Sequence, residues 1–431
     1  MSPKDNETRD VYSFFAEDPQ KADKEFFGRV ANSDRRGFLK KTGLATMAAM
    51  VGTSIPFHRN MPIGFVPAAM AQDNVLMGKD GLTLLNDRPV NAETPPELLD
   101  DAITPTSRHF VRNNGIPPEE VDPNTWELTI DGFVDNSMKL TIADLREQFE
   151  VVTMALTLEC GGNGRGFFDP PAKGNQWTYG AVACSEWTGV RLKDVLEKAG
   201  VQSNVIYTAH YGADTHLSGK AGKLSLSRGV PISKAMTDNI LIAFEMNGAP
   251  LHPMNGAPLR LVVPGWPAST AQKWLKRIEL RDIVHDGPKM TGKAYRVPNR
   301  KVSAGEEVAK EDFVIIERMP VKSLVTFPAN NADIGMETDV RGHAWAGDRT
   351  IQKLEVSLDF GATWQDAELD QPVNSGAWQN WRTIAKFAQA GYYEIWARAT
   401  DSDGVMQPFA IDWNPKGYLN NTMHRVGVRA S

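Results

Sequence analysis

Between about residue 106 and residue 300, short apolar stretches alternate with short stretches of helical periodicity. The apolar stretches are rich in β-branched residues and are bounded by turn residues, so they predict strands at 126–134, 151–158, 205–209, 240–246 and 258–266. Apolar residues three and four positions apart predict helices at 141–149, 190–199 and about 233–236, the first capped by Thr141 and the second ended by Gly200. Because strands and short helices alternate unevenly, the pattern predicts a mixed α+β domain and not a doubly wound sheet.

From about residue 301 the pattern changes to a period of two. The segments 351–359 and 393–400 alternate apolar with polar residues, are bounded by Gly361 and by Asp403-Gly404, and have no useful helical stretch between them. This spacing predicts an all-β sandwich of roughly 120 residues. We interpret the tryptophans of this region as sandwich core and not as a ligand surface; they are Trp345, Trp364, Trp378, Trp381, Trp396 and Trp413.

Four segments follow from these patterns. The chain of 431 residues is longer than one hydrophobic core usually serves. We predict a processed segment at 1–71, an extended, proline-bearing arm without a core of its own at 72–105, an α+β domain at 106–300 and the sandwich domain at 301–431.

The N-terminus carries the features of an export signal. Residues 33–40 contain the twin-arginine signature Arg35-Arg36. A modest apolar run follows at 44–51, and an A-x-A cleavage site follows at 69–71. The apolar run is too short to cross a bilayer, which takes about 20 apolar residues, so we expect cleavage and no retained membrane anchor, the alternative interpretation. The sequence therefore predicts a periplasmic protein exported in folded form, with no membrane span after processing.

Charge and cysteine content narrow the function further. Charged residues make up 23% of the chain and the formal net charge is −6, so no basic surface for nucleic acid is expected. Cys160 and Cys184 are the two cysteines, and neither belongs to a C-x-x-C-H motif, so we expect no c-type haem in this chain. In an oxidising compartment the two could form a disulfide, which would exclude either thiol as a metal ligand.

The sequence around Cys160 is the strongest candidate for chemistry. Cys160 follows the predicted strand 151–158, and glycines at four of the positions 160–166 leave the backbone free to approach a bulky group. Asn163 and Arg165 supply hydrogen-bond donors beside the sulfur. These features suit a soft-metal ligand presented to a large cofactor, whereas the alternative is a buried structural cysteine next to a turn.

Several motifs, taken together and in order, resemble those of the sulfite oxidase family of molybdenum enzymes. They are Phe110-Val111-Arg112-Asn113, Cys160-Gly161-Gly162-Asn163, Pro258-Leu259-Arg260-Leu261, Lys273-Trp274, Gly342-His343-Ala344-Trp345 and Trp413-Asn414-Pro415. The resemblance runs from about Phe110 to the C-terminus. It implies a molybdopterin-binding α+β domain followed by an immunoglobulin-like dimerisation domain.

The resemblance also implies roles for individual residues. It makes Cys160 the protein ligand of molybdenum and one molybdenum–molybdopterin the cofactor of each chain. The expected cofactor contacts are Phe110, Val111, Arg112, Asn113, Asn114, Asp214, Asn255, Arg260, Ala271, Gln272 and Lys273. Arg112, Arg165, Trp177 and Lys416 match the residues that gather and enclose an anionic substrate.

Two departures from the family pattern separate the chain from members that oxidise sulfite. Leu226 stands where those members have a tyrosine, so no phenol is expected there, and Lys416 stands where they have an arginine. Lysine is a point charge without the bidentate fork of arginine. These changes favour the sulfane dehydrogenase branch of the family, which belongs to the bacterial sulfur-oxidising (Sox) system.

That resemblance implies partners as well as a substrate. The substrate would be sulfane sulfur on a cysteine of a carrier protein, and the electrons would pass to a separate c-type cytochrome subunit. A homodimer formed through the C-terminal domain, within a larger hetero-oligomer, is expected. The alternative enzyme is a cytochrome-linked periplasmic sulfite dehydrogenase.

Four interpretations without a catalytic role stay open. The chain could be an exported binding module with a Cys160–Cys184 disulfide and no cofactor. Arg260, which lies in an apolar strand and needs an anionic partner, could form an internal salt bridge instead of binding a phosphate. Arg165 could be a solvated loop charge, and Cys184 is interpreted as a small buried residue.

Overall fold

The structure is a computed structural model that describes residue 21, residues 76–119 and residues 121–431. The predicted twin-arginine signature, apolar run and cleavage site lie outside these residues. Within the described part, every helix is too short or too polar to reach across a lipid bilayer. The described residues from 76 onward belong to one compact unit, in which two halves are joined.

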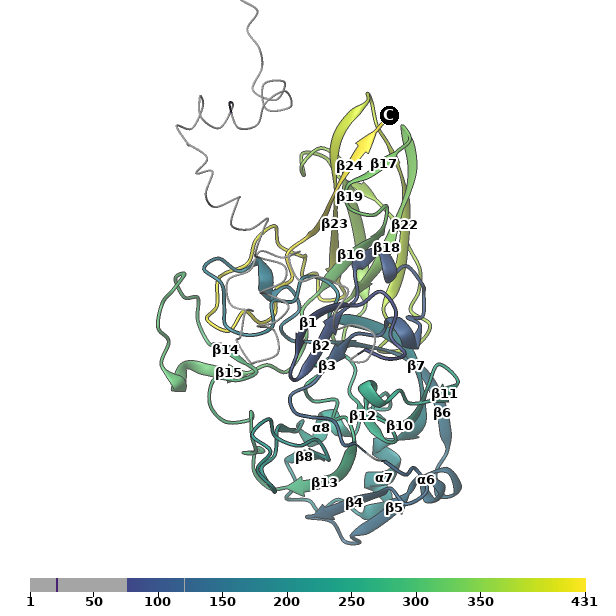
Figure 1. Ribbon diagram of the computed structural model, residues 1–431, viewed down its shortest axis with the longest axis vertical. Coiled ribbons are helices and arrows are strands. Elements are labelled where there is room, and N and C mark those ends of the chain that lie inside the picture. The colour runs from purple at the N-terminus through teal and green to yellow at the C-terminus, as the bar shows by residue number, and fades with distance from the viewer. Residues whose placement is uncertain (1–20, 22–75, 120) are drawn as a thin grey trace, which may run out of the picture. The chain divides into compact units, whose positions relative to one another are not determined.

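Two five-stranded sheets form the first half (Figure 1). The antiparallel sheet has the order β11-β10-β7-β6, with β12 also paired to β10; the strands are β6 (Val151–Glu159), β7 (Val182–Arg191), β10 (Leu241–Met246), β11 (Ala249–Pro250) and β12 (Arg260–Val262). The mixed sheet has the order β5-β4-β13-β8-β9; its strands are β4 (Glu127–Gly132), β5 (Met138–Thr141), β8 (Tyr207–Gly212), β9 (Ser227–Arg228) and β13 (Leu275–Arg281). One apolar cluster joins them, in which Leu128 and Ile278 of the mixed sheet pack with Leu156 and Trp187 of the antiparallel sheet. The predicted α+β architecture is confirmed.

Three α-helices accompany these sheets, with local signals visible in the sequence. Helix α6 (Ile142–Gln148) starts at a capping box in which Thr141 and Asp144 exchange side-chain and backbone hydrogen bonds. Helix α7 (Leu192–Ala199) begins two residues later than predicted, because residues 190 and 191 continue β7, and it ends at Gly200 with a φ of 73°. The third helix is α8 (Ile232–Ala235).

Two predicted strands have different bounds in the structure. The strand predicted at 258–266 is limited to β12. The strand predicted at 205–209 is β8, which continues to Gly212, so Asp214 follows two residues after its end.

Asn247 and Gly248 form the predicted tight turn between β10 and β11, both with positive φ.

The region predicted as an arm forms a β-hairpin in the structure. Strands β1 (Thr83–Asp87) and β2 (Val90–Glu93) pair with each other, and β2 pairs with β3 (Val111–Arg112). Leu76, Leu82, Ala92 and Val111 pack together as a small buried cluster. The segment is therefore folded as a hairpin, and the prediction of an extended arm is wrong in this respect. Its buried cluster includes Val111 of the next segment. Short 3-10 helices η2 (Pro96–Leu98) and η3 (Thr106–Arg108) lead into β3.

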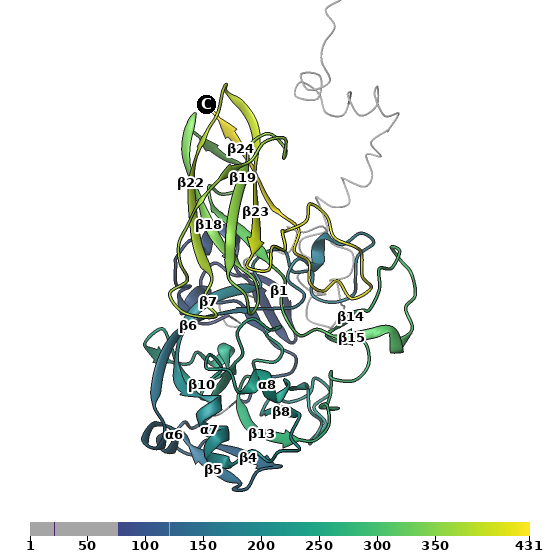
Figure 2. The same cartoon turned by 180° about the vertical axis from the view of Figure 1, so that it is seen from behind.

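The C-terminal half is the predicted β-sandwich, seen from both sides in Figures 1 and 2. One sheet has the order β16-β18-β22-β21, and its strands are β16 (Lys322–Phe327), β18 (Glu337–Trp345), β21 (Glu368–Leu369) and β22 (Gln379–Lys386). The other has the order β17-β24-β23-β19-β20, and its strands are β17 (Ala332–Ile334), β19 (Ile351–Ser357), β20 (Gln365–Asp366), β23 (Gly391–Asp401) and β24 (His424–Ala430). The hairpin of β14 (Arg296–Pro298) and β15 (Phe313–Ile315) precedes the sandwich, with η6 (Lys310–Asp312) between its strands. Two further 3-10 helices, η4 (Arg165–Phe167) and η5 (Pro253–Asn255), lie in the first half.

Three tryptophans of the sandwich lie in its core or at the junction of the two halves. Trp381 packs inside the sandwich, as predicted. Trp345 and Trp378 instead pack with Cys184 and Leu99 of the first half, so interpreting them as sandwich core was wrong. These rings close the junction because both halves present apolar surface there.

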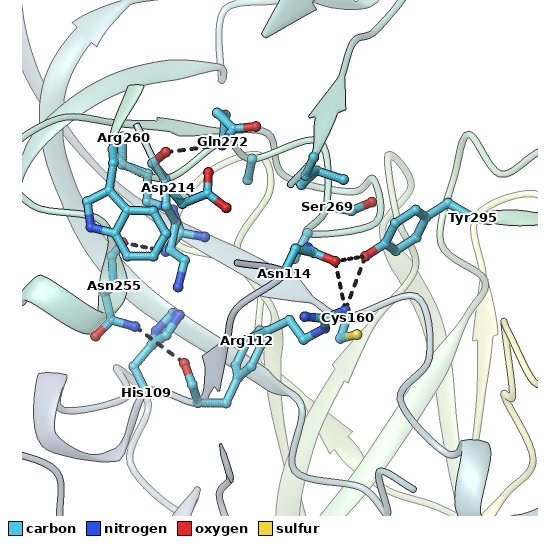
Figure 3. Close-up of a pocket in the computed structure, with 16 residues that line it drawn as sticks. His109, Arg112, Asn114, Cys160, Asp214, Asn255, Arg260, Ser269, Gln272 and Tyr295 are labelled. Carbon is cyan, nitrogen blue, oxygen red and sulfur yellow. Dashed lines mark hydrogen bonds between the residues drawn. The ribbon is translucent and has the colours of Figure 1, made fainter. Parts of the chain in front are cut away.

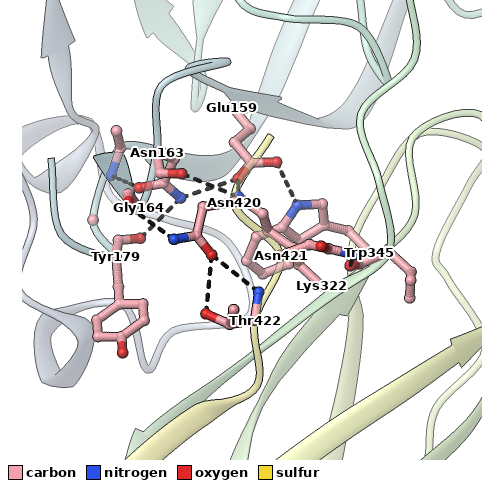
Figure 4. A network of polar contacts seen from close by, with 12 residues as sticks. Glu159, Asn163, Gly164, Tyr179, Lys322, Trp345, Asn420, Asn421 and Thr422 are labelled. Carbon is pink, nitrogen blue, oxygen red and sulfur yellow. Dashed lines mark hydrogen bonds and ion pairs between the residues drawn. The ribbon is translucent and has the colours of Figure 1, made fainter. Parts of the chain in front are cut away.

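A buried carboxylate links the two halves at this junction (Figure 4). Glu159, the last residue of β6, is 2% exposed and pairs with Lys322 of β16. Its second oxygen accepts a hydrogen bond from Trp345 Nε1 at 2.8 Å. Asn163 donates to Glu159 at 3.0 Å, and Asn420 Nδ2 donates to the Gly164 carbonyl at 2.9 Å. The loop after Cys160 is thus held by residues of the sandwich.

Removing the cation of this pair should destabilise the chain strongly. Lys322→Met leaves the Glu159 carboxylate buried without its charge partner, which costs about 3–5 kcal/mol. Chemical denaturation should show a lower midpoint for this variant. The control is Lys386→Met in the exposed Lys386–Glu337 pair, which should cost less than about 1 kcal/mol. Equal losses in the two variants would contradict a structural role for the buried pair, and Glu159→Gln combined with Lys322→Met should recover part of the loss.

Candidate cofactor and active site

Cys160 occupies the first position after β6, where the strand has entered the buried interior. Its backbone N–H donates to the Ala181 carbonyl at 2.9 Å, and its carbonyl accepts from the Asn163 N–H at 2.8 Å. The residue is 5% exposed. Cys160 and Cys184 are both free thiols, so the disulfide considered as an alternative is wrong. Cys184 is fully buried, and burial raises the pKa of its thiol to about 11.

Glycines of the loop make room for an arginine side chain. A β-carbon at Gly162 would lie 2.4 Å from the guanidinium of Arg165. Gly164 has a φ of 87° and leads into η4. The group that approaches this backbone closely is therefore Arg165.

Cys160 lies in a pocket where ten of the predicted site residues meet (Figure 3). These are Phe110, Arg112, Asn114, Cys160, Asp214, Asn255, Arg260, Ala271, Gln272 and Lys273. Six further residues line it, namely His109, Leu226, Ala268, Ser269, Trp274 and Tyr295. They come from loops and strand ends of both sheets, from β3 with its flanking residues and from the segment before β14, so the topology gathers them although they are far apart in the sequence.

Five predicted site residues do not line this pocket. Val111 packs into the hairpin cluster, and Asn113 is fully buried with its N–H donating to Asn91. Trp177 is fully buried and meets Phe110 edge-on, with ring centroids 6.5 Å apart, so it supports the pocket wall from behind. Arg165 and Lys416 also lie outside the lining.

Arg165 is neither solvated nor part of the pocket lining. It is 6% exposed, and its Nε donates to the Lys416 carbonyl at 2.9 Å while Nη1 donates to the Asn175 carbonyl at 3.1 Å. The guanidinium lies over the Tyr418 ring at 4.8 Å. Interpreting Arg165 as a solvated loop charge is therefore wrong. Burial, with the charges of Lys293 and Arg165, lowers the pKa of Lys416.

One end of the pocket gathers buried positive charge. Arg260 Nη1 donates to the Asn255 carbonyl at 2.9 Å, and its Nε has no hydrogen-bond partner. Lys273 Nζ donates to the Met254 carbonyl at 2.8 Å and also to Asn113. Burial lowers the pKa of Arg260 to about 9 and lowers that of Lys273 well below its ordinary value, the latter also through Arg260. No acidic side chain within the described residues pairs with Arg260, so the internal salt bridge considered above is wrong.

Lys79, from the hairpin region, adds a cation that the motif analysis missed. Its Nζ donates to Asn255 Oδ1 at 2.5 Å and to the carbonyls of Thr106 and His109 at 2.6 and 3.1 Å. Burial, followed by the charge of Arg260, lowers the pKa of Lys79 to about 7. No sequence signal identified it, because a single lysine in a polar segment is not distinctive.

The other end of the pocket places a phenol beside Cys160. Arg112 Nη2 donates to Asn114 Oδ1 at 3.0 Å and to the Tyr295 hydroxyl at 3.4 Å, and that hydroxyl donates to Asn114 Oδ1 at 3.2 Å. Burial raises the pKa of Tyr295, but the charges of Arg112 and Lys289 outweigh it and bring the pKa below its ordinary value. Leu226, which stands where members that oxidise sulfite have a tyrosine, packs in one cluster with Tyr295. Tyr295 therefore supplies a phenol from a different part of the chain.

Comparison with known proteins identifies the family. Residues 114–289 match the oxidoreductase molybdopterin binding domain, and residues 313–431 match the Mo-co oxidoreductase dimerisation domain. Sulfite oxidase of Gallus gallus is 32% identical over 363 residues, which are 80% of this chain and 77% of that protein. The chain belongs to the sulfite oxidase family. Its residues 114–289 are the molybdopterin-binding domain of that family.

Two further family members bear on the comparison. Mitochondrial sulfite oxidase of Rattus norvegicus is 32% identical over 373 residues, which are 82% of this chain but 66% of the rat protein, slightly less than two thirds of its length. The crystal structure of the sulfane dehydrogenase SoxCD from Paracoccus pantotrophus aligns with 87% of this chain and 95% of the matched chain. That alignment has a TM-score of 0.67 and 26% sequence identity.

The pocket fits the cofactor that the family implies. Arg260 Nε, Ser269 Oγ and Gln272 Oε1 are buried at the pocket without hydrogen-bond partners. Buried polar atoms are nearly always bonded. Arg260 Nε and Ser269 Oγ can donate to a phosphate oxygen, and Gln272 Oε1 can accept from an N–H group of a pterin, so the set suits a pterin phosphate. No group of three or more His, Cys, Asp and Glu side chains in the described residues could hold a metal ion by itself.

The buried lysine predicts a pH dependence of the cofactor-free protein. Folding lowers the pKa of Lys79 from 10.5 to about 7, so between these values the unfolded chain binds the additional proton. Stability should therefore rise with pH in this range, by at most about 1.4 kcal/mol per pH unit for this one group. Thermal denaturation between pH 7 and pH 10 should show a shallower rise for Lys79→Met. The same slope in both proteins would contradict this assignment.

Proposed function

We propose that this chain oxidises sulfane sulfur bound to a cysteine of a carrier protein in the periplasm. The observation that carries the proposal is the pocket at Cys160, in which Leu226 and Tyr295 line the wall that would face a substrate. The likeness to a sulfane dehydrogenase over 95% of the matched chain supports this choice of substrate. The proposed export rests on the twin-arginine signature, which lies outside the described residues.

Cys160 would be the protein ligand of molybdenum. A soft thiolate suits this metal, and coordination keeps the sulfur deprotonated. Bound there, the molybdenum–molybdopterin cofactor supplies oxygen-atom transfer to sulfur and accepts the electrons that this oxidation releases. Asn255, Arg260, Gln272 and Lys273 would hold the phosphate and pterin, because they offer buried donors that lack an anionic partner.

The remaining cofactor contacts are proposed from the same pocket. Phe110, Asn114, Asp214 and Ala271 line it, whereas Val111 and Asn113 act from behind the lining by fixing the backbone of β3 and its continuation.

The protein's role toward the substrate is to attract and orient an anion. Arg112 and Lys289 bring positive charge to the end of the pocket beside Cys160, where Lys289 Nζ donates to Asn114 Oδ1 at 2.6 Å. Positive charge there draws in an anionic sulfur species and stabilises negative charge that develops during its oxidation. Arg165, Trp177 and Lys416 act through packing and electrostatics: Arg165 ties the Cys160 loop to residue 416, and Trp177 supports Phe110.

Electrons and subunits complete the proposal. With no haem motif in its sequence, the chain would pass electrons to a c-type cytochrome subunit. Two copies would associate through residues 313–431, which match a dimerisation domain, within a hetero-oligomer. The alternative function is a cytochrome-linked sulfite dehydrogenase, which the 32% identity to sulfite oxidases favours.

Replacing each thiol separately tests the proposed metal ligand. Cys160→Ser should reduce bound molybdenum at least about tenfold, because a hydroxyl is a poor substitute for a soft thiolate. Cys184→Ser is the matched control, since Cys184 is also buried and free but lies in the junction cluster, and it should keep its molybdenum. Elemental analysis gives the metal content, and X-ray absorption of the wild type should show a third sulfur at molybdenum. An unchanged metal content in Cys160→Ser would overturn the proposed site.

Substrate assays distinguish the two proposed enzymes. With a c-type cytochrome as acceptor, the chain should turn over sulfane sulfur on a carrier cysteine at least about tenfold faster than free sulfite, a difference of about 1.4 kcal/mol in the barrier. Steady-state kinetics with each substrate gives the ratio. Rapid oxidation of free sulfite without any carrier would instead support the sulfite dehydrogenase.

A further inference from the structure

Three polar residues of the hairpin region contact the lining of the cofactor pocket or the segment directly behind its wall. They are Lys79, Asn91 and Glu93, and they precede residue 114, where the match to the molybdopterin-binding domain begins. Their contacts give the segment 76–93 a function that the family match does not assign.

Lys79 contacts the positively charged end of the pocket. Its Nζ shares Asn255 with Arg260: Lys79 donates to the Asn255 side chain, and Arg260 donates to the Asn255 carbonyl. Lys273 is the third cation. After burial, the charge of Arg260 lowers the pKa of both Lys79 and Lys273. Asp214 is the acidic residue that lines the pocket, so three cations face one carboxylate. A dianionic phosphate would balance this charge.

The unused hydrogen-bonding capacity at this end agrees with a bound phosphate. Arg260 is 4% exposed, and its Nε is a donor without a partner that a phosphate oxygen could use. A buried guanidinium without an acidic partner is costly unless an anionic ligand takes that place.

Asn91 connects the hairpin to the end of the pocket beside Cys160. It is 1% exposed and lies opposite Arg112 in the pairing of β2 with β3. Its Oδ1 accepts from the Asn113 N–H at 2.9 Å and from Arg112 Nη1 at 3.3 Å. Asn91 therefore fixes the guanidinium of Arg112 from the side opposite Asn114.

Glu93 attaches the end of β2 to the segment that follows Trp177. The Glu93 carboxylate is 4% exposed and accepts from Thr178 N at 2.8 Å and from Thr178 Oγ1 at 2.9 Å. The Gly180 N–H also donates to Glu93 Oε2, at the longer distance of 3.4 Å. The hairpin region is thus anchored both at the pocket wall and at the cation cluster.

We propose that Lys79 is a phosphate-binding residue of the cofactor site, and that residues 76–93 form a clasp that closes on the bound cofactor. This inference rests on the proposed binding of the cofactor at Cys160. Without an anion, hydrogen bonds to Thr106, His109 and Asn255 hold Lys79 against the charge of Arg260, so the Lys79 end of the clasp is less stable than in the loaded enzyme. With a phosphate bound, the same charges hold that end closed, and cofactor insertion precedes closure.

The test compares Lys79→Met with Lys79→Arg and with the control Lys139→Met, which removes an exposed lysine of β5. In the intact enzyme, Lys79→Met should lose molybdenum about tenfold faster or more during dialysis, because a charge-assisted hydrogen bond to phosphate is lost. Lys79→Arg, which keeps a positive donor, should fall between Lys79→Met and the wild type, and Lys139→Met should match the wild type. Molybdenum retained by Lys79→Met as in the wild type overturns the inference.

Hydrogen exchange on the wild type tests the clasp without any variant. In the cofactor-free chain, amides of residues 76–93 should exchange faster than in the loaded enzyme, and added inorganic phosphate should restore part of the protection. Unchanged exchange in this segment under all three conditions overturns the clasp even if Lys79→Met cannot be purified. A wild type that never binds molybdenum would instead refute the proposed function, so the two failures can be told apart.

Discussion

The structure depends on positive charge buried in one pocket without matching negative charge. Arg260 and Lys273 lie in a region where an unpaired charge costs several kcal/mol, and their lowered pKa values express that cost. Apolar packing in the first half carries this cost in the cofactor-free protein. A phosphate ligand would remove much of it, which explains why a binding protein would keep such an arrangement.

Cys160 is held by contacts that do not involve a metal. The last residue of β6 is fixed by Lys322 and Trp345 of the sandwich, and Asn163 closes the following loop onto Glu159. The thiol therefore has a defined position before any ligand binds. A pre-positioned thiolate on a rigid strand end loses little conformational freedom when it coordinates a metal.

The sequence predicted those features that depend on neighbours along the chain. The capping box at Thr141, the glycine that ends α7 and the turn at Asn247 are decided within a few residues, so local patterns identify them. Ten residues chosen from motifs line one pocket, whereas the positions of Arg165, Trp177 and Lys416 behind it depend on packing between distant loops. Lys79 and Tyr295 were missed for the same reason, because tertiary contacts alone bring a solitary lysine and a linker tyrosine to the pocket.

The carboxylate of Glu159 also makes the pocket of the first half dependent on the second half. Its partners Lys322 and Trp345 belong to the other half of the molecule, yet it adjoins the cysteine of the pocket. If an unrelated domain replaced the sandwich, the Glu159 carboxylate would be buried without its cation Lys322. The neighbouring Cys160 thiol would then be held less firmly in place. Loss of the sandwich would therefore disturb the cysteine pocket as well as the junction.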